Sequence, residues 1–159
     1  MSREVLILRH AHAEPIAAGV GDFERPLSKV GGEEADSIGR WLSDHDVELT
    51  QVLSSPATRA RQTAERALAI AGGPAIAFEP HIYEATPGVL MELLDRAAGE
   101  GRTMLVGHNP GLEQLVALLL EGRSDDYRGL PPGGLAWIKL PDEGELEPGC
   151  GTARHFWFP

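Results

Sequence analysis

A short apolar run near the amino terminus, Val5–Leu8, ends directly at Arg9 and His10. An unbroken run of mostly branched apolar residues predicts a strand that is buried on both faces of a sheet. In open α/β sheets, ligands bind just beyond the carboxyl ends of the strands, so we expect Arg9 and His10 at a binding site. Arginine can hold an oxyanion through two parallel hydrogen bonds, and histidine can act as a nucleophile, a base or a metal ligand.

Simpler interpretations of this stretch remain open when it is considered alone. A single histidine at the end of a strand is more often a hydrogen-bonded structural residue than a catalytic one. His10 and His12 lie two residues apart, a spacing that also suits a metal site. The stretch indicates catalysis only if further cationic or imidazole groups reach the same edge of the sheet.

The apolar pattern of the rest of the chain alternates between strands and helices. Further strands are predicted at 51–54, 75–78, 103–107, 135–140 and 153–158. Helices are predicted from Ser28, as the N-cap, to about residue 43, from Pro56 to residue 71, over 89–98 and from residue 111 onward. This order predicts the α/β class, as a single three-layer domain with a mostly parallel central sheet and helices on both faces. The last two strands are expected to form a hairpin at one edge.

Length, charge and cysteine content narrow the classes of protein. The 159 residues suffice for one domain, 1–159, and a lone Cys150 excludes an internal disulfide. No apolar run approaches the roughly 20 residues that span a membrane, so we expect a cytoplasmic protein without a membrane partner. The net charge of −10 argues against nucleic acid as the main partner. Since this charge also repels phosphate, a phosphate site would need local cations. The oligomeric state is not determined by these features.

The segment 12–27 shows no clean periodicity and contains Pro15, Gly19, Gly21 and Pro26. Loops of this length inside a small domain are usually functional or mobile. We therefore expect this segment to border the site.

Two more junctions between a strand and a helix carry cationic or imidazole groups. Arg59 is expected in the first turn of the helix after 51–54, where free backbone N–H groups already favour an anion. His108 follows the predicted strand 103–107 and precedes the start of another helix. Taken singly, Arg59 and Arg61 could be solvated surface residues and His108 a core histidine. Together with Arg9 and His10, the residues Arg59 and His108 predict one oxyanion site.

Four segments of the sequence occur in the order of a known family's motifs. They are Leu8-Arg9-His10-Ala11, Pro26-Leu27-Ser28 with Gly31, Ser54-Ser55-Pro56 with Arg59 and Gln62-Thr63-Ala64, and Gly107-His108-Asn109-Pro110. Together they resemble the histidine phosphatase superfamily, which has the phosphoglycerate-mutase-like fold, and in particular its compact SixA-type phosphohistidine phosphatase branch. Ala11 departs from the glycine that is usual in the wider superfamily. The chain also lacks the insertion with which larger members cover small substrates, which implies an open site.

The resemblance implies a role for each motif residue. His10 is expected to attack phosphorus, and Arg9, Arg59 and His108 to surround the phosphoryl oxygens. Glu84 matches the region of the family's proton donor, and Arg25 is a further candidate for phosphate binding. Neither a metal nor another cofactor is expected, because the arginines can stabilise the transferred phosphoryl group. The remaining histidines are expected to be structural or at the surface: His12, His45, His81 and His155.

Four functions therefore stay open. The leading one is a metal-independent phosphatase that acts on phosphohistidine in a signalling or phosphotransfer protein. The second is a small-molecule phosphomonoester phosphatase of the same fold. A metal hydrolase that uses His10 and His12 is the third, although the chain is far shorter than the roughly 250 residues of the barrels in which this pairing occurs. The fourth is a non-catalytic phosphoprotein-binding module, against which the presence of His10 argues.

Overall fold

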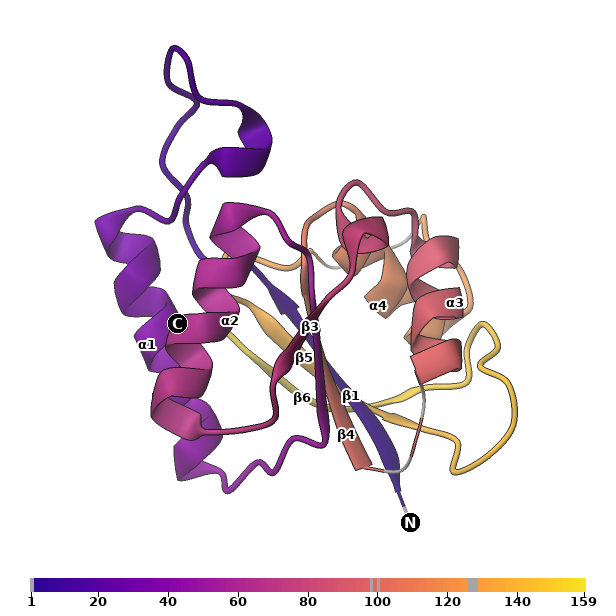
Figure 1. Cartoon of the computed structure of the whole chain (residues 1–159). Coiled ribbons are helices and arrows are strands. Elements are labelled where there is room, and N and C mark those ends of the chain that lie inside the picture. The colour runs from indigo at the N-terminus through magenta and orange to yellow at the C-terminus, as the bar shows by residue number, and fades with distance from the viewer. Residues whose placement is uncertain (1, 98, 100, 126–128) are drawn as a thin grey trace.

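One six-stranded sheet forms the centre of the computed structural model, which describes residues 2–97, 99, 101–125 and 129–159. Its strands are β1 (Arg3–Arg9), β2 (Gln51–Ser54), β3 (Ile76–Phe78), β4 (Gly101–Gly107), β5 (Leu135–Leu140) and β6 (Thr152–Trp157). Their spatial order is β3-β2-β4-β1-β5-β6 (Figure 1). The first four strands run parallel, and β5 and β6 form the antiparallel hairpin at one edge. The predicted mostly parallel sheet is confirmed.

Two helices cover each face of the sheet. The helices within the described residues are α1 (Lys29–Asp44), α2 (Thr58–Ala71), α3 (Pro87–Ala97) and α4 (Gly111–Glu121), with short 3-10 turns η1 (Asp22–Glu24) and η2 (Pro80–Ile82). The pair α1 and α2 packs on one face, and α3 and α4 pack on the other (Figure 1). This arrangement is the predicted three-layer α/β architecture, and none of these helices is long and apolar enough to cross a membrane.

The central strand β1 supplies side chains to both hydrophobic cores. Leu6 and Leu8 belong to the core beneath α1 and α2, whereas Val5 and Ile7 belong to the core beneath α3 and α4. Successive side chains of a strand point to opposite faces, which explains why this run is apolar at every position. All four side chains are fully buried.

The register of the parallel strands brings three strand ends to one edge. Arg9 at the end of β1 pairs with Gly107 at the end of β4, and Ser54 at the end of β2 pairs with Val106. Beyond the strands, the backbone N–H of His10 donates to the carbonyl of Gly107 at 3.0 Å. The residues that follow these strands must therefore lie next to one another.

The third helix begins earlier than the apolar pattern predicted. α3 starts at Pro87 instead of residue 89, and residue 98, its predicted end, lies outside the described residues. Thr86 lies before the first turn, and its hydroxyl accepts from the backbone N–H of Val89 at 3.3 Å. Proline is favourable in the first turn because its missing N–H would have no partner there. The predicted loop at 81–88 thus contains part of η2 and the start of α3.

Candidate active site

Three junctions that are distant in sequence meet at the carboxyl edge of β1, β2 and β4. Arg9 and His10 come from the end of β1, and His108 follows β4, so that the His10 and His108 ring centroids lie 5.2 Å apart. Arg59 lies in the first turn of α2, as predicted, and its Nε donates to Nε2 of His10 at 3.4 Å. The structure thus brings together the four residues that the sequence analysis placed at one oxyanion site.

The hydrogen bonds of His10 determine which ring nitrogen is free to react. Its Nδ1 lies 2.7 Å from the carbonyl oxygen of Ala11, which can only accept, so Nδ1 carries the proton. Nε2 then has the lone pair, on the side of the ring that faces Arg59. Burial, together with the charges of Arg59, Arg9 and Arg25, lowers the pKa of His10 to about 4. The ring is therefore neutral near pH 7, as a nucleophile must be.

Thr63 fixes the backbone on which His10 depends. The backbone N–H of Ala11 donates to Oγ1 of Thr63 at 3.0 Å, and that hydroxyl donates to the carbonyl of Arg59 at 2.7 Å. The end of β1 is thereby joined to the first turns of α2. Ala11 and Thr63 are fully buried, so this link keeps His10 and Arg59 in a fixed relation.

Arg59 is buried, with 5% of its surface exposed, so its interpretation as a solvated residue is wrong. Its Nη1 donates to the backbone carbonyl of Asp22 at 2.6 Å, and its Nη2 donates to Oδ2 of Asp22 at 3.0 Å. Arg61, two residues further along α2, is half-buried, with 42% of its side chain exposed, and pairs with Glu65 at 2.8 Å. The surface interpretation therefore holds for Arg61.

Asp22 is a site residue that the sequence analysis missed. Besides Arg59, its carboxylate accepts from the hydroxyl of Tyr83 at 2.6 Å and from Nε and Nη2 of Arg25 at 3.2 and 3.0 Å. The hydrogen bond from Tyr83, followed by those of Arg59 and Arg25, lowers the pKa of Asp22 to about 2. The segment 12–27 borders the site, as expected, through this residue.

A hollow of about 290 Å³ lies in front of His10. The side chains of Arg9, Arg25 and Arg59 all line it. Arg9 donates through Nη1 to the carbonyl of Leu130 at 3.1 Å, while its buried Nε has no hydrogen-bond partner within the described residues. Three guanidinium groups around a neutral imidazole form a site suited to a phosphoryl group.

His108, which follows the neighbouring strand β4, lines the same hollow. Its Nε2 lies 2.8 Å from Oγ of Ser55, which also accepts from the backbone N–H of Ala57 at 3.2 Å. Burial, followed by the charges of His10 and Arg59, lowers the pKa of His108 to about 3, so this ring is neutral too. Its Nδ1 is buried and lacks a hydrogen-bond partner among the residues that the structure describes. Ser55, which the sequence analysis did not single out, holds the orientation of this ring.

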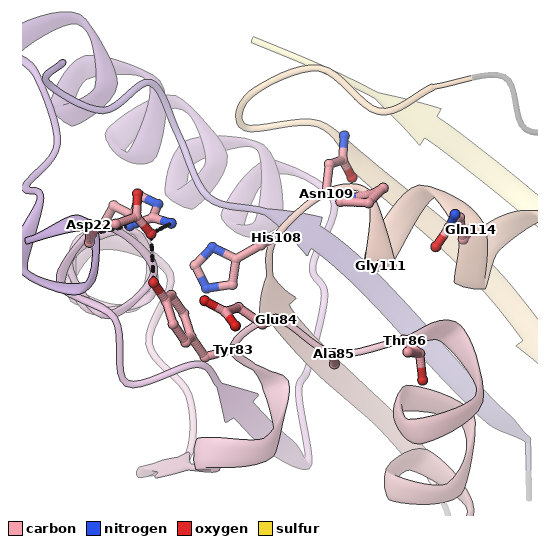
Figure 2. A pocket seen from close by; sticks show the side chains of 11 residues that line it. Asp22, Tyr83, Glu84, Ala85, Thr86, His108, Asn109, Gly111 and Gln114 are labelled. Atoms are coloured by element: carbon pink, nitrogen blue, oxygen red, sulfur yellow. Dashed lines mark hydrogen bonds and ion pairs between the residues drawn. The ribbon is translucent and has the colours of Figure 1, made fainter. Parts of the chain in front are cut away.

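Glu84 does not line the hollow of His10 but the neighbouring one, of about 420 Å³ (Figure 2). The two hollows share Arg59, His108 and Asn109. Glu84 has a φ of 58°, a left-handed backbone conformation that costs a non-glycine residue free energy and is often found at functional sites. The structure thus places Glu84 in a different hollow from His10, one that Arg59 also lines.

The other histidines lie in different places. His12 was expected to be structural or at the surface; it is exposed and 2.7 Å from Oγ of Ser28, yet it also lines the hollow of His10. His81 is exposed, and His45 and His155 lie beside Trp41. No group of three or more histidine, cysteine, aspartate or glutamate side chains in the described part of the chain is arranged to hold a metal ion.

Comparisons with known proteins agree with this geometry. Residues 5–98 match the model of the histidine phosphatase superfamily, branch 1. The phosphohistidine phosphatase SixA of Escherichia coli is 33% identical over 127 residues, which cover 76% of each chain. A crystal structure from Agrobacterium tumefaciens, assigned as SixA, superimposes with a TM-score of 0.85 at 28% identity, over 100% of this chain and 99% of that one. The protein histidine phosphatase SixA in complex with tungstate gives a TM-score of 0.81 at 27% identity, over 98% and 96%. From its motifs, its fold and these relatives, the chain belongs to branch 1 of the histidine phosphatase superfamily.

Proposed function

We propose that this protein is a phosphatase that accepts a phosphoryl group on His10 and takes it from phosphohistidine on a partner protein. The observation that carries the proposal is the state of His10. Its ring is neutral, its Nδ1 proton is held by the carbonyl of Ala11, and its Nε2 lone pair lies beside Arg59 at a hollow lined by three arginines. A binding module would need the arginines but not a nucleophile in this state.

In the first step, the lone pair of His10 Nε2 forms a bond to phosphorus. The bond between phosphorus and the substrate nitrogen breaks, and its electron pair stays on the departing imidazole. Arg9, Arg25 and Arg59 provide positive charge to the phosphoryl oxygens, which carry the negative charge of the transition state. These groups can supply the stabilisation that a metal ion gives elsewhere, so we expect activity to persist in the presence of a chelator.

In the second step, water attacks phosphorus and the bond to Nε2 breaks. The oxygen and both hydrogens of the water leave with the phosphoryl group as dihydrogen phosphate, and Nε2 recovers its lone pair. Because Nδ1 keeps its proton throughout, the carbonyl of Ala11 maintains the same ring orientation in both steps.

Two observations favour a protein as the substrate. β3 ends at Phe78 and α3 begins at Pro87, so the connection that could cover the site is short. A relative that is 33% identical over 76% of this chain and a solved structure that superimposes over 100% of it are both called phosphohistidine phosphatases. A phosphohistidine that is protonated on its other ring nitrogen already holds the proton that lets it leave as a neutral imidazole, which reduces the need for Glu84 as a proton donor. The phosphorylated partner is thus proposed to be a signalling or phosphotransfer protein.

The test measures phosphate release from a phosphohistidine protein and from p-nitrophenyl phosphate, with a chelator present. Wild type, His10→Ala and the control His81→Ala, which alters an exposed histidine, are compared. We expect preferential release from phosphohistidine in wild type and the control, and none in His10→Ala. Preference for the ester would favour the small-molecule phosphatase, and activity that the chelator abolishes would favour a metal hydrolase. Phosphoprotein binding without turnover, unchanged in His10→Ala, would favour the binding module.

A further inference from the structure

The hollow beside the phosphoryl site is larger than the phosphoryl site itself. Its volume is about 420 Å³, within the range of small-molecule pockets, against about 290 Å³ for the hollow of His10. Arg59 and His108 form part of both walls, so a group bound to phosphorus in the first hollow can extend into the second. Figure 2 shows Tyr83, Glu84 and Thr86 on one side of this second hollow and His108 and Gln114 on the other.

The charges of the second hollow differ from those of the first. The first is lined by three arginines, whereas Arg59 is the only basic side chain among the described residues that line the second. Both Nη atoms of Arg59 donate to Asp22, and its Nε donates to His10. The charge of this guanidinium is therefore shared between Asp22 and the phosphoryl site, and no unpaired cation is left among the described residues for an anion in the second hollow.

Glu84 contributes an unpaired negative charge to the same hollow. Its carboxylate has no hydrogen bond or ion pair with the part of the chain that the structure describes, although it lines the wall. Asp22, the other carboxylate in this lining, is already paired with Arg59 and Arg25. The remaining polar side chains there are uncharged, and His108 is neutral because burial lowers its pKa to about 3. A leaving group that carries a carboxylate would be repelled by Glu84, and no free cation among the described residues of the hollow would offset this repulsion. A leaving group that carries a hydrogen-bond donor or a positive charge would find an acceptor in the carboxylate of Glu84.

Close backbone packing holds Glu84 in this place. Gly111, the first residue of α4, lies so near the carbonyl of Ala85 that a Cβ atom there would collide with it. The backbone N–H of Ala85 also donates to the carbonyl of Ile82 at 3.3 Å. Together with the left-handed conformation of Glu84, this packing indicates a specified position for its side chain, in contrast to a freely moving loop carboxylate.

We propose that the second hollow receives the leaving group and that Glu84 makes it select neutral or cationic, donor-bearing leaving groups, such as an imidazole or an amine, over carboxylate-bearing ones. This inference rests on the proposed phosphatase function and deepens it. An imidazole, the leaving group of phosphohistidine, satisfies the requirement. Phosphorylated carboxylic acids do not.

Three esters that differ in charge at one position test the proposal: para-(aminomethyl)phenyl, para-(hydroxymethyl)phenyl and para-(carboxymethyl)phenyl phosphate. At low salt, we expect kcat/KM of the cationic ester to exceed that of the anionic ester about tenfold, and the ratio to shrink as salt screens the charges. Glu84→Gln should reduce the ratio to about threefold or less. Glu121→Gln at the far end of α4 removes the same charge outside the hollow and should leave the ratio unchanged. Because a ratio is compared, a general loss of activity cancels.

Equal kcat/KM for the cationic and anionic esters in wild type, or an unchanged ratio in Glu84→Gln, would overturn the proposal. The affinities of the corresponding benzylphosphonates, measured by calorimetry, provide a readout that does not require turnover. If neither these esters nor a phosphohistidine protein is dephosphorylated, the proposed phosphatase function fails. In that case, the affinities of the cationic and anionic phosphonates still test the proposed selectivity. Equal affinities would refute it, and a preference for the cationic phosphonate would support it.

Discussion

Two carboxylate clusters at opposite ends of the sheet contain nearly the same kinds of residues, but their arginines lie in different surroundings. At the start of β1, Glu4 accepts from Arg102 at 2.9 Å, from Arg154 and from the indole Nε1 of Trp137 at 3.1 Å. Beyond the other end of the sheet, Asp22 accepts from Arg25, Arg59 and Tyr83. Each cluster contains one carboxylate, two arginines and one aromatic donor.

The clusters differ in what their arginines face. Arg102 and Arg154 lie over the ring of Trp137, at 5.3 and 4.5 Å from its centroid, and Glu4 is 4% exposed. Burial raises the pKa of Glu4, but the hydrogen bonds of Arg154 and Arg102 outweigh it, so the pKa is lowered. That cluster joins β1, β4, β5 and β6, which are distant in sequence.

In the Asp22 cluster, both arginines line the hollow in front of His10. A carboxylate paired with two arginines thus stabilises the fold where the arginines cover a ring. The same group prepares an anion site where the arginines border a cavity.

The largest expected effect is on catalysis when Arg59 is removed. Arg59→Ala should lower kcat/KM for phosphohistidine by about 10³-fold, since a guanidinium at a transferring phosphoryl group contributes at least this much. Arg61→Ala, on the same helix but paired with Glu65 at the surface, is the matched control. Phosphate-release assays check both variants. A loss of similar size in Arg61→Ala would contradict the assignment.

The second prediction concerns the contribution of the Glu4 cluster to the free energy of unfolding. Glu4→Gln should reduce the free energy of unfolding by about 2 kcal/mol, because two arginines and a buried indole lose their charged acceptor. The value of kcat should stay within about twofold of wild type, as this end of the sheet is remote from His10. Urea unfolding and phosphate release measure the two quantities. A variant with unchanged stability and impaired turnover would reverse the roles of the clusters.

A smaller catalytic effect is expected from the partner of Arg59. Asp22→Asn keeps the shape of the side chain but removes the charge that holds Arg59 and Arg25, so kcat should fall about tenfold. The free energy of unfolding should change less than in Glu4→Gln, because Asp22 is partly exposed. Full activity of Asp22→Asn would show that Arg59 keeps its position without the carboxylate.

The last prediction concerns the pH dependence of stability and activity. The folded pKa of His10 is about 4, below the ordinary value near 6.5, so the unfolded chain binds a proton more readily in this range. Stability is therefore complete above about pH 6.5 and falls as the pH drops towards about 4. The acid limb of kcat/KM should likewise lie near pH 4. Urea titrations of wild type and His10→Asn between pH 4 and 7 check this sign, and a steeper fall in the variant would contradict it.

The sequence predicted which residues meet at the candidate site better than it predicted the two paired carboxylates, Glu4 and Asp22. Arg9, His10 and His108 follow apolar strands, and the end of a parallel strand is a local signal that also determines spatial neighbourhood. Asp22 gave no signal, because its partners Arg59 and Tyr83 lie 37 and 61 residues away. Arg59 and Tyr83 contact Asp22 only because the segment 12–27 folds back towards them.

Glu4 illustrates the same limit within a strand that was predicted correctly. The apolar pattern placed the strand at 5–8, whereas β1 begins at Arg3 and buries Glu4. Its partners Arg102 and Arg154 are 98 and 150 residues away in sequence. Such a long-range ion pair overrides the tendency of a charged residue to stay exposed, and no local pattern reveals it.

The most direct test of the account is the chemical identity of the intermediate. The protein is mixed with a phosphohistidine protein, quenched in base within milliseconds, digested and analysed by mass spectrometry, with His10→Ala as the control. We predict a phosphoryl group on Nε2 of His10 that forms and decays at rates compatible with turnover. Turnover without a phosphoryl group on His10, or undiminished turnover in His10→Ala, would contradict the central claim.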